Sequence, residues 1–317
     1  MKPFLVVNPR SANGATGRQF DAILRAVRSA VGDCGHAFTA RPMHAAELAR
    51  KAIEGGHDLV IAVGGDGTMN EVVNGFFAEP LPGATEPPRV LNGEAALALI
   101  PRGTGGDFRK TIGVDTDLAR AVEHLKAPPR RLDVGLVEYT GEDGRSGQRL
   151  FVNVADAGLG GQVVNIANRS SKILGGALTF KLASARALIG WRDQRLRYSL
   201  DGGPVEELPV TGFNVANGRF FGGGMQVAPD ARVDDGLFHL TIWTGFGLLD
   251  FVTKSKNLYD GTHVKFPNTR VATARKVRLE PADPPGSRPV LLDLDGEQVG
   301  RCPATFTVLP GAIGLVA

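Results

Sequence analysis

Cysteine is scarce in this sequence. The 317 residues include two cysteines, Cys34 and Cys302, which lie far apart and show no CxxC or Cys/His spacing. A disulfide framework needs several cysteines, and a zinc site needs closely spaced Cys or His ligands. The sequence therefore argues against both, and we expect the two thiols to be small core residues.

Long apolar runs are also missing. No uninterrupted apolar stretch approaches the roughly 20 residues that a membrane-spanning helix needs. The beginning of the chain, MKPFLVVNPR, does not resemble a signal peptide, because Asn8 and Pro9 interrupt the run before an apolar core can form. We therefore expect a cytoplasmic protein.

Neither sign of charge is in strong excess. The chain contains 36 Lys and Arg against 33 Asp and Glu, a net charge of +3, which is too small to indicate nucleic-acid binding. Cations nevertheless gather around the apolar segment 173–191. This region is either a basic, partly apolar face that rests on anionic lipid or a helix with solvated cations on its outer side. The cations are Lys172, Lys181, Arg186, Arg192, Arg195 and Arg197.

The first part of the chain alternates apolar strands with amphipathic helices. Such alternation is typical of a parallel sheet covered by helices, and KAPPRR at 126–131 is the best candidate for a domain boundary. We therefore predict an α/β domain over residues 1–127. The expected strands lie at 3–7, 36–40, 59–63 and 96–100, and the expected helices at 20–31 and 45–53.

Residues 128–317 instead contain many short alternating strands divided by Gly, Pro and Asp turns. This pattern predicts a β-rich, sandwich-like second domain. Its final strand can return to the first domain, and helical patterns at 163–191 and 248–259 indicate insertions. The expected strands lie at 132–139, 195–200, 210–217, 238–243, 276–280, 289–296 and 305–309.

The stretch LVIAVGGDGTMNEVVNGFF at 59–77 combines a buried strand, a glycine turn and a helical apolar stripe. Thr68 and Glu71 have the spacing of a capping box. This order directs main-chain N–H groups and the positive end of a helix dipole at whatever lies above the turn, and phosphate is the usual occupant. Asp66 would repel a phosphate, so we interpret it as a Mg²⁺ ligand or a proton acceptor. The alternative is an Asp that only shapes the turn.

Two further turns repeat this logic. IPRGTGGDF at 100–108 follows a buried strand and offers the hydroxyl of Thr104, and NPRSANG at 8–14 ends the first strand. Turns at the same ends of parallel strands face one crevice. The sequence contains neither GxxxxGK[ST] nor a GxGxxG after the first strand, which argues against a P-loop enzyme and a common dinucleotide site.

Carboxylates cluster twice in the β-rich part. Asp230, Asp234 and Asp235 lie beside a glycine run, and LDLDGEQVG at 292–300 holds Asp293, Asp295 and Glu297. Clustered carboxylates are costly unless they share a cation or a proton, and oxygen ligands of this kind suit Mg²⁺ or Ca²⁺. The alternative is that DDG and DGE are hairpin turns.

Together these motifs resemble the catalytic family of diacylglycerol kinases, which also holds bacterial lipid kinases, sphingosine kinases and ceramide kinases. GGDGT alone is shared with NAD kinases, but GGDGTMNEVVNG combined with the later glycine and DDG motif is specific to the lipid-kinase branch. The resemblance covers nearly the whole chain. The motifs are NPRSANG, GGDGTMNEVVNG, PRGTGGDF, FVNVADAGLG, NGRFFGGGMQVAPDARVDDGLF and LDLDGE.

The resemblance implies that residues 1–127 form a nucleotide-binding domain, that residues 128–317 form the domain for the lipid substrate, and that ATP and lipid meet in a cleft. It also assigns residues to each role. The implied nucleotide contacts are Asn8, Arg10, Ser11, Thr39, Gly65, Asp66, Gly67, Thr68, Met69, Asn70 and Thr104. The implied Mg²⁺ site consists of Asp235 and the carbonyls of Arg232 and Leu237, supported by Asp133 and Asp234. Branches of the family differ in the general base, so the candidates for catalysis are Asp66, Asp295 and Glu297.

Three positions depart from the family pattern. Gly106 replaces a usual Asn, and the first loop spaces Gly14 and Gly17 unusually. Both departures can alter nucleotide contacts without removing a carboxylate. Asp156 stands where small residues are common, and one interpretation is that it contacts a substrate head group.

The resemblance implies a kinase that uses ATP and Mg²⁺ to phosphorylate a hydroxyl of diacylglycerol or of a sphingoid or ceramide-like lipid, in lipid metabolism such as phospholipid biosynthesis. Such an enzyme would dock reversibly on the inner membrane surface from the cytoplasm. A homodimer is compatible with the sequence. The alternatives are an NAD kinase and a non-catalytic lipid-binding protein on the same fold.

Overall fold

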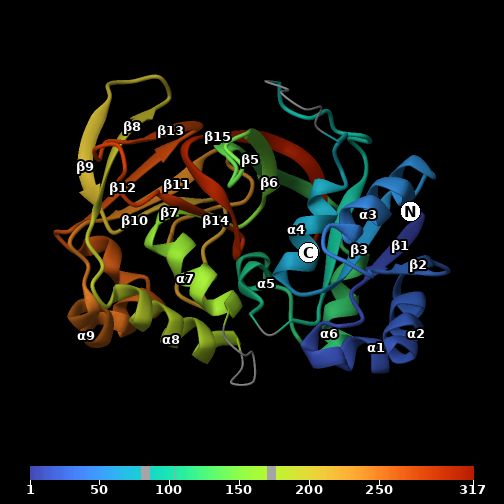
Figure 1. Cartoon of the computed structure of the whole chain (residues 1–317). Helices are drawn as coiled ribbons and strands as arrows, with labels where there is room; N and C mark the ends of the chain where they lie inside the picture. Colours follow the sequence, from blue (N-terminus) through green and yellow to red (C-terminus); the bar gives the residue numbers. More distant parts are fainter. Residues whose placement is uncertain (80–85, 104, 170–175) are drawn as a thin grey trace. The chain divides into compact units, whose positions relative to one another are not determined.

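The computed structural model describes residues 1–79, 86–103, 105–169 and 176–317, with the side chains of 168, 169 and 176–180 left out of the description. The chain divides into two compact units (Figure 1). Unit 1 comprises Met1–Val134 and Pro310–Ala317, and unit 2 comprises Gly135–Leu309. The first unit thus extends to Val134, a few residues beyond the boundary at 127 that KAPPRR predicts.

Unit 1 is built on a parallel sheet with the strand order β15-β4-β3-β1-β2. Every residue of β3 and β4 is buried, as expected for apolar strands covered on both faces. The predicted parallel sheet is therefore confirmed. Its strands are β1 (Pro3–Val7), β2 (Gly35–Phe38), β3 (Leu59–Gly64), β4 (Ala96–Pro101) and the end of β15 (Glu297–Val316).

Helices lie on both sides of this sheet (Figure 1). In α2, Ile23 and Val27 face the core, and Gly32 ends the helix with a positive φ of 85°. The helices predicted at 20–31 and 45–53 are both present, the second extended by one residue at each end. The helices of unit 1 are α1 (Ala15–Arg18), α2 (Phe20–Val31), α3 (His44–Glu54), α4 (Asp66–Asn74), α5 (Asp107–Ile112) and α6 (Leu118–Glu123).

The predicted capping box of α4 is wrong. The helix begins at Asp66, so Thr68 already lies inside its first turn, where its hydroxyl accepts a hydrogen bond from Asn8 at 3.0 Å. The Glu71 carboxylate accepts instead from the N–H of Ala45 at 3.0 Å, at the beginning of α3. Glu71 therefore caps the neighbouring helix rather than its own.

Unit 2 is antiparallel, which confirms the expected β-rich fold. Strands follow the order β12-β11-β10-β7-β14-β15, and β15 also pairs with β13, which continues to β8 and β9. The strand β5 pairs with β6. The remaining bounds are β5 (Arg130–Thr140), β6 (Ser146–Phe151), β7 (Val154–Gly158), β8 (Gln194–Leu200), β9 (Glu206–Val210), β10 (Gly212–Ala216), β11 (Phe238–Trp243), β12 (Thr269–Ala274), β13 (Lys276–Pro281) and β14 (Leu291–Leu294).

Aromatic side chains form the centre of the unit 2 core. Phe151 stacks on Phe238 with ring centroids 5.6 Å apart, and Phe306 meets Phe151 edge-on at 6.2 Å. Tyr198 of β8 meets Phe213 of β10 edge-on at 5.3 Å. Strands that are not hydrogen-bonded neighbours are therefore joined by side-chain packing, which is the defining contact of a sandwich.

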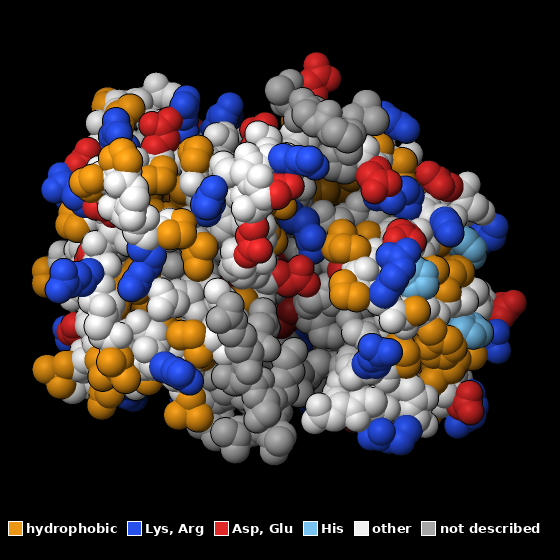
Figure 2. All heavy atoms as spheres, viewed as in Figure 1, with side chains coloured by type: hydrophobic (Ala, Val, Ile, Leu, Met, Phe, Trp, Pro, Cys, Tyr) orange, Lys and Arg blue, Asp and Glu red, His pale blue; other side chains and the backbone are white. Residues whose placement is uncertain are grey.

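The segment 210–217, expected as one strand, contains the end of β9 and the separate strand β10. The single helical insertion expected at 163–191 contains two helices, α7 (Leu159–Arg169) and α8 (Gly176–Leu188), whereas α9 (Leu248–Tyr259) has the predicted bounds. The outer face of α9 carries apolar side chains, which gather at the lower left of Figure 2. No helix among the described residues is long and apolar enough to cross a membrane.

Candidate active site

Two glycine turns of unit 1 pack main chain against main chain. A Cβ on Gly103 would lie 2.5 Å from the Cα of Gly65, and one on Gly65 would lie 3.2 Å from the Cα of Gly103. The N–H of Arg102 donates to the carbonyl of Gly64 at 2.7 Å. The turns that follow β3 and β4 therefore lie together, as their positions at the same sheet edge predict. Thr104, a predicted nucleotide contact in the second turn, lies outside the described residues.

The carboxylate of Asp66 joins these two turns. It accepts hydrogen bonds from the N–H groups of Asp107 at 3.0 Å and Phe108 at 3.4 Å, at the beginning of α5. Burial is the largest effect on its pKa and raises it, and the nearby charge of Asp107 raises it further against these hydrogen bonds. Asp66 is the first residue of α4. The residue is partly exposed, while its carboxyl group, with a raised pKa, lies against the beginning of α5. Such a group can accept a proton or bind a cation, and it also stabilises the second turn.

The NPRSANG turn is joined to the first glycine turn through Asn8. Its side-chain amide donates to the Thr68 hydroxyl at 3.0 Å, while its side-chain oxygen accepts from the N–H of Arg10 at 3.0 Å. Ser11 donates its hydroxyl to the carbonyl of Asn8 at 2.9 Å. Thr39 follows β2 and donates its N–H to Val7 at 2.8 Å. These predicted nucleotide contacts thus lie at the carboxyl ends of neighbouring parallel strands.

Other predicted nucleotide contacts differ in what they can offer a ligand. Met69 is fully buried and Asn70 is 2% exposed, so their side chains belong to the core and helix packing of unit 1. Gly65 and Gly67 are partly exposed and present only main chain. A phosphate at this turn would therefore meet main-chain N–H groups at the beginning of α4, in the arrangement that helix N-termini use for anions.

The predicted Mg²⁺ ligands are distributed over both units. In unit 2, Asp235 accepts hydrogen bonds from the N–H of Leu237 at 3.1 Å and from His239 at 2.9 Å, and Asp234 pairs with Arg232 at 3.4 Å. In unit 1, the buried Asp133 accepts from the N–H of Gly311 at 2.6 Å.

The chemistry of the Asp235 turn fits the proposed ion. One carboxylate and two main-chain carbonyls are hard oxygen donors of the type that Mg²⁺ takes, and each Asp235 oxygen has a single described hydrogen bond. Within the described ranges, no group of three or more His, Cys, Asp or Glu side chains could hold a metal. The Mg²⁺ site therefore stays a prediction that relies on main-chain carbonyls.

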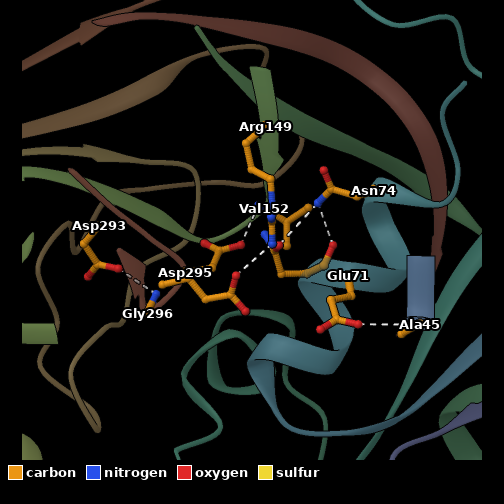
Figure 3. A network of polar contacts seen from close by, with 10 residues as sticks. Ala45, Glu71, Asn74, Arg149, Val152, Asp293, Asp295 and Gly296 are labelled. Carbon is orange, nitrogen blue, oxygen red and sulfur yellow. Dashed lines mark hydrogen bonds and ion pairs between the residues drawn. The ribbon is translucent and has the colours of Figure 1, made fainter. Parts of the chain in front are cut away.

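Asp295 in unit 2 binds main-chain N–H groups. Its carboxylate accepts from Val152, Asn153 and Val154, each at 3.0 Å (Figure 3). Asp295 itself has a positive φ of 50°, which Asp tolerates at turns. The DGE motif is therefore a hairpin turn between β14 and β15 whose first carboxylate anchors the segment before β7. Because the carboxylate is occupied by three main-chain N–H groups, this geometry supports an anchoring role for Asp295.

The other acids of this motif also have partners. Glu297, the third candidate for the general base, pairs with Arg149 at 2.7 Å. Asp293 is buried and accepts from the N–H of Gly296 at 2.9 Å, as Figure 3 shows. Burial raises the pKa of the Asp293 carboxyl well above its usual value, and the neighbouring Asp156 adds to the effect. The roles predicted for Asp295 and Glu297 in catalysis stay predictions.

Unit 2 contains a pocket that the sequence did not predict. Asp156 lies in it, together with apolar side chains from α7, α8, α9 and β11. The departure of Asp156 from the family pattern was the one signal available in the sequence. The pocket itself was not predictable because its walls come from segments that are far apart along the chain.

Comparison with known proteins gives a consistent result for both parts of the chain. Residues 2–137 match the family described as the diacylglycerol kinase catalytic domain, and residues 153–317 match the YegS C-terminal NAD kinase beta sandwich-like domain. A protein of Pseudomonas fluorescens strain Pf-5, named "probable lipid kinase YegS-like", is 32% identical over 94% of this chain and 90% of its own length. The chain belongs to the diacylglycerol kinase family.

Other members of the diacylglycerol kinase family support this assignment. The diacylglycerol kinase of Bacillus subtilis strain 168 is 26% identical over 96% of this chain and 92% of its own length. The crystal structure of a diacylglycerol kinase from Bacillus anthracis strain Sterne is 21% identical, with a TM-score of 0.68 over 99% of this chain and 96% of that one. At this identity the structural likeness concerns the fold. Membership of a kinase family confirms the prediction of an enzyme.

Proposed function

We propose that this diacylglycerol kinase family member transfers the γ-phosphoryl group of ATP to the hydroxyl of a lipid, in the presence of Mg²⁺. The observation that carries the proposal is the pair of packed glycine turns in unit 1, which are joined by the carboxyl group of Asp66, whose pKa is raised by burial. Main-chain N–H groups at the beginning of α4 suit phosphate oxygens. Asp66 suits the proton of an attacking hydroxyl or a cation bound to the phosphates.

The proposed roles follow from what each group can do. Asn8 and Ser11 hold the NPRSANG turn in place beside Thr68, which leaves the exposed Arg10 available to phosphate. Mg²⁺ would neutralise phosphate charge when bound. The Asp235 turn, with the carbonyls of Arg232 and Leu237, is the proposed place for a second, structural ion. We favour Asp66 over Asp295 as the base because Asp66 lies beside the packed glycine turns at the beginning of α4, whereas Asp295 binds three main-chain N–H groups in the hairpin turn between β14 and β15.

Transfer of labelled phosphate tests the proposal against its alternatives. With labelled ATP, Mg²⁺ and a mixed lipid extract, we expect label in the organic phase and none after chelation of the metal. Label in NAD would indicate an NAD kinase. Label in neither acceptor would contradict the proposal and favour a lipid-binding protein. Diacylglycerol and a ceramide, each presented as pure lipid, identify the acceptor.

We also propose that unit 2 docks on membranes through an apolar surface on α8 and α9, called here the α8–α9 surface. It consists of Leu182, Ile189, Leu249 and Val252, which are 53%, 69%, 77% and 67% exposed. Leu182 lies on α8 and Ile189 directly follows its last residue, while Leu249 and Val252 lie three residues apart on one face of α9. The exposed cations Lys181 and Arg186 lie on α8 among these residues. Apolar side chains with nearby cations are the combination that binds interfaces with anionic lipid.

This surface replaces part of the one expected from sequence. Arg195 and Arg197 lie on β8, outside both helices, and their guanidinium groups pair with Glu207 on β9. Lys172 lies outside the described residues. The arginines of β8 are therefore better explained by the pairing of β8 with β9.

Replacing Leu182, Leu249 and Val252 together by Ser should weaken binding to phosphatidylglycerol-containing vesicles by at least about tenfold. An apolar side chain contributes about 1.5–3 kcal/mol when fully buried, so even partial burial of three exceeds the roughly 1.4 kcal/mol of a tenfold change. Vesicle sedimentation measures the effect. The matched control replaces Val205 and Val271 by Ser. These two valines are 68% and 59% exposed elsewhere in unit 2, so the control should leave binding unchanged. Equal losses in both variants would remove the α8–α9 surface as the docking site.

A further inference from the structure

A pocket of about 460 Å³, including its open mouth, lies within unit 2. Its walls are mainly apolar and include Leu188 of α8, Met225, Trp243 and Phe251 of α9. Small-molecule sites combine apolar walls of this kind with a few polar groups that fix the orientation of the ligand. Among the described residues that line the pocket, Asp156 is the one ionisable side chain.

Asp156 is placed unusually for a carboxylate. It lies in β7 and is 2% exposed, and it accepts main-chain hydrogen bonds from Gly160, at 2.8 Å, and from Gly161. No Lys or Arg in the described part of the chain forms an ion pair with it. Its neighbours add no positive charge, since β14 places Asp293 beside it and the Cys302 thiol lies near. Burial raises the pKa of Asp156 to about 7.

Two glycines leave the room that this carboxyl occupies. A Cβ on Gly160 would lie 2.3 Å from Oδ1 of Asp156, and one on Gly212 would lie 3.0 Å from its Oδ2. Both glycines line the same pocket. The two glycines therefore leave space for the carboxyl group of Asp156. Among the described lining residues, the Asp156 side chain is the one ionisable part of an otherwise mainly apolar wall. Burying such a group costs free energy unless it is hydrogen-bonded.

We propose that this pocket binds the aliphatic chain of a lipid and that Asp156 accepts a hydrogen bond from a hydroxyl or amine group carried by that lipid. A ligand with such a donor adds a hydrogen bond to the buried carboxyl, whereas a plain hydrocarbon or an ether adds none. Asp156 is therefore a specificity-determining residue. The inference deepens the proposed function, since it selects lipid substrates with a hydrogen-bond donor that enters the pocket.

The location of the pocket supports a lipid ligand. Leu188 and Phe251 line it from α8 and α9, the helices whose outer faces form the α8–α9 surface. An aliphatic chain that leaves a bilayer at this surface would meet apolar side chains on both faces of the same helices. The alternative to a role in ligand binding is a purely structural one, in which Asp156 only accepts the hydrogen bond from Gly160 at the beginning of α7.

Binding of matched aliphatic probes tests the proposal without ATP. The chain has two tryptophans, so a Trp191→Phe background leaves Trp243 in the pocket wall as the fluorescent reporter. The probes are 1-undecanol, its isomer decyl methyl ether, and undecylamine. We expect the alcohol and the amine to bind about tenfold more tightly than the ether, the value of one hydrogen bond. Equal affinity of alcohol and ether in the otherwise unaltered protein overturns the proposal.

Variants of Asp156 separate the ligand role from helix binding. Asp156→Asn keeps an oxygen for the Gly160 N–H but loses the charge, so the preference for the amine should disappear while the melting temperature changes little. Gly212→Ala keeps the carboxylate and crowds its Oδ2, and should reduce the preference for both donors. Unchanged probe selectivity in a folded Asp156→Asn protein would leave only the helix-binding role. If the Asp156→Asn protein does not fold, the Gly212→Ala protein provides the test: unchanged probe selectivity in it would leave Asp156 only the helix-binding role.

The outcomes separate this inference from the proposed kinase activity. Probe selectivity without phosphoryl transfer would support the pocket and contradict the kinase. Phosphoryl transfer to lipid without probe selectivity would support the kinase and contradict the role of Asp156. Probes with the hydroxyl and with the amine distinguish the two donor sources.

Discussion

Replacing Asp66 by Asn should lower phosphoryl transfer by a factor of about 10² to 10⁴, the usual effect of losing a general base or metal link. The substitution keeps the size of the side chain and one oxygen for the N–H groups of Asp107 or Phe108. Stability should therefore fall only by about 1 kcal/mol, the value of one hydrogen bond. Initial rates with saturating ATP and a thermal melt measure both effects.

Asp107→Asn is the matched control for this experiment. Asp107 is a buried acid at the beginning of α5, next to the Asp66 carboxylate, and its own carboxylate pairs with Lys110 at 3.0 Å. Its replacement disturbs the beginning of α5 without removing the Asp66 carboxylate, so we expect less than about a tenfold loss of activity. Turnover of Asp66→Asn above about a tenth of the unaltered enzyme would show that Asp66 only shapes the turn.

Replacing Asp295 by Ala should lower the melting temperature of the protein by roughly 5–10 °C, because the N–H groups of Val152, Asn153 and Val154 lose a charged acceptor. Asp295→Asn should cost less, since its amide oxygen can still accept. Differential scanning calorimetry at neutral pH gives the comparison.

Glu297→Gln provides the contrast for the Asp295 experiment. Its ion pair with Arg149 involves a Glu side chain that is 41% exposed, so the loss should be within about 1 kcal/mol. A stable Asp295→Ala protein that has lost only its turnover would contradict the anchoring role and restore Asp295 as a candidate base.

The elements that were predicted well are those with strong local signals. The run Leu59–Val63 is apolar at every position, and α9 has a clear helical stripe, so both were placed within a residue of their bounds. The glycine turns were recognisable for the same reason, because their residues are consecutive. Their mutual packing followed from strand order, which the alternation of strands and helices predicts.

What could not be predicted depends on contacts between distant segments. The strand β7, with the sequence VADAG, is fully buried but too short and too rich in small residues to give a strand pattern. Glu71 caps α3 rather than α4, because a carboxylate three residues from Thr68 can also reach a neighbouring helix. The pocket around Asp156 is invisible in the sequence, since its walls come from separate helices and strands.

The course of β15 also affects the order in which the protein can fold during synthesis. Gly314, Leu315 and Val316 pair in parallel with the beginning of β4, yet all of unit 2 is translated between β4 and these residues. While unit 2 is being made, this edge of β4 lacks its partner strand and offers free main-chain hydrogen-bonding groups to other chains. Emergence of residues 310–317 from the ribosome thus completes the first unit last, after every strand of the second has been synthesised.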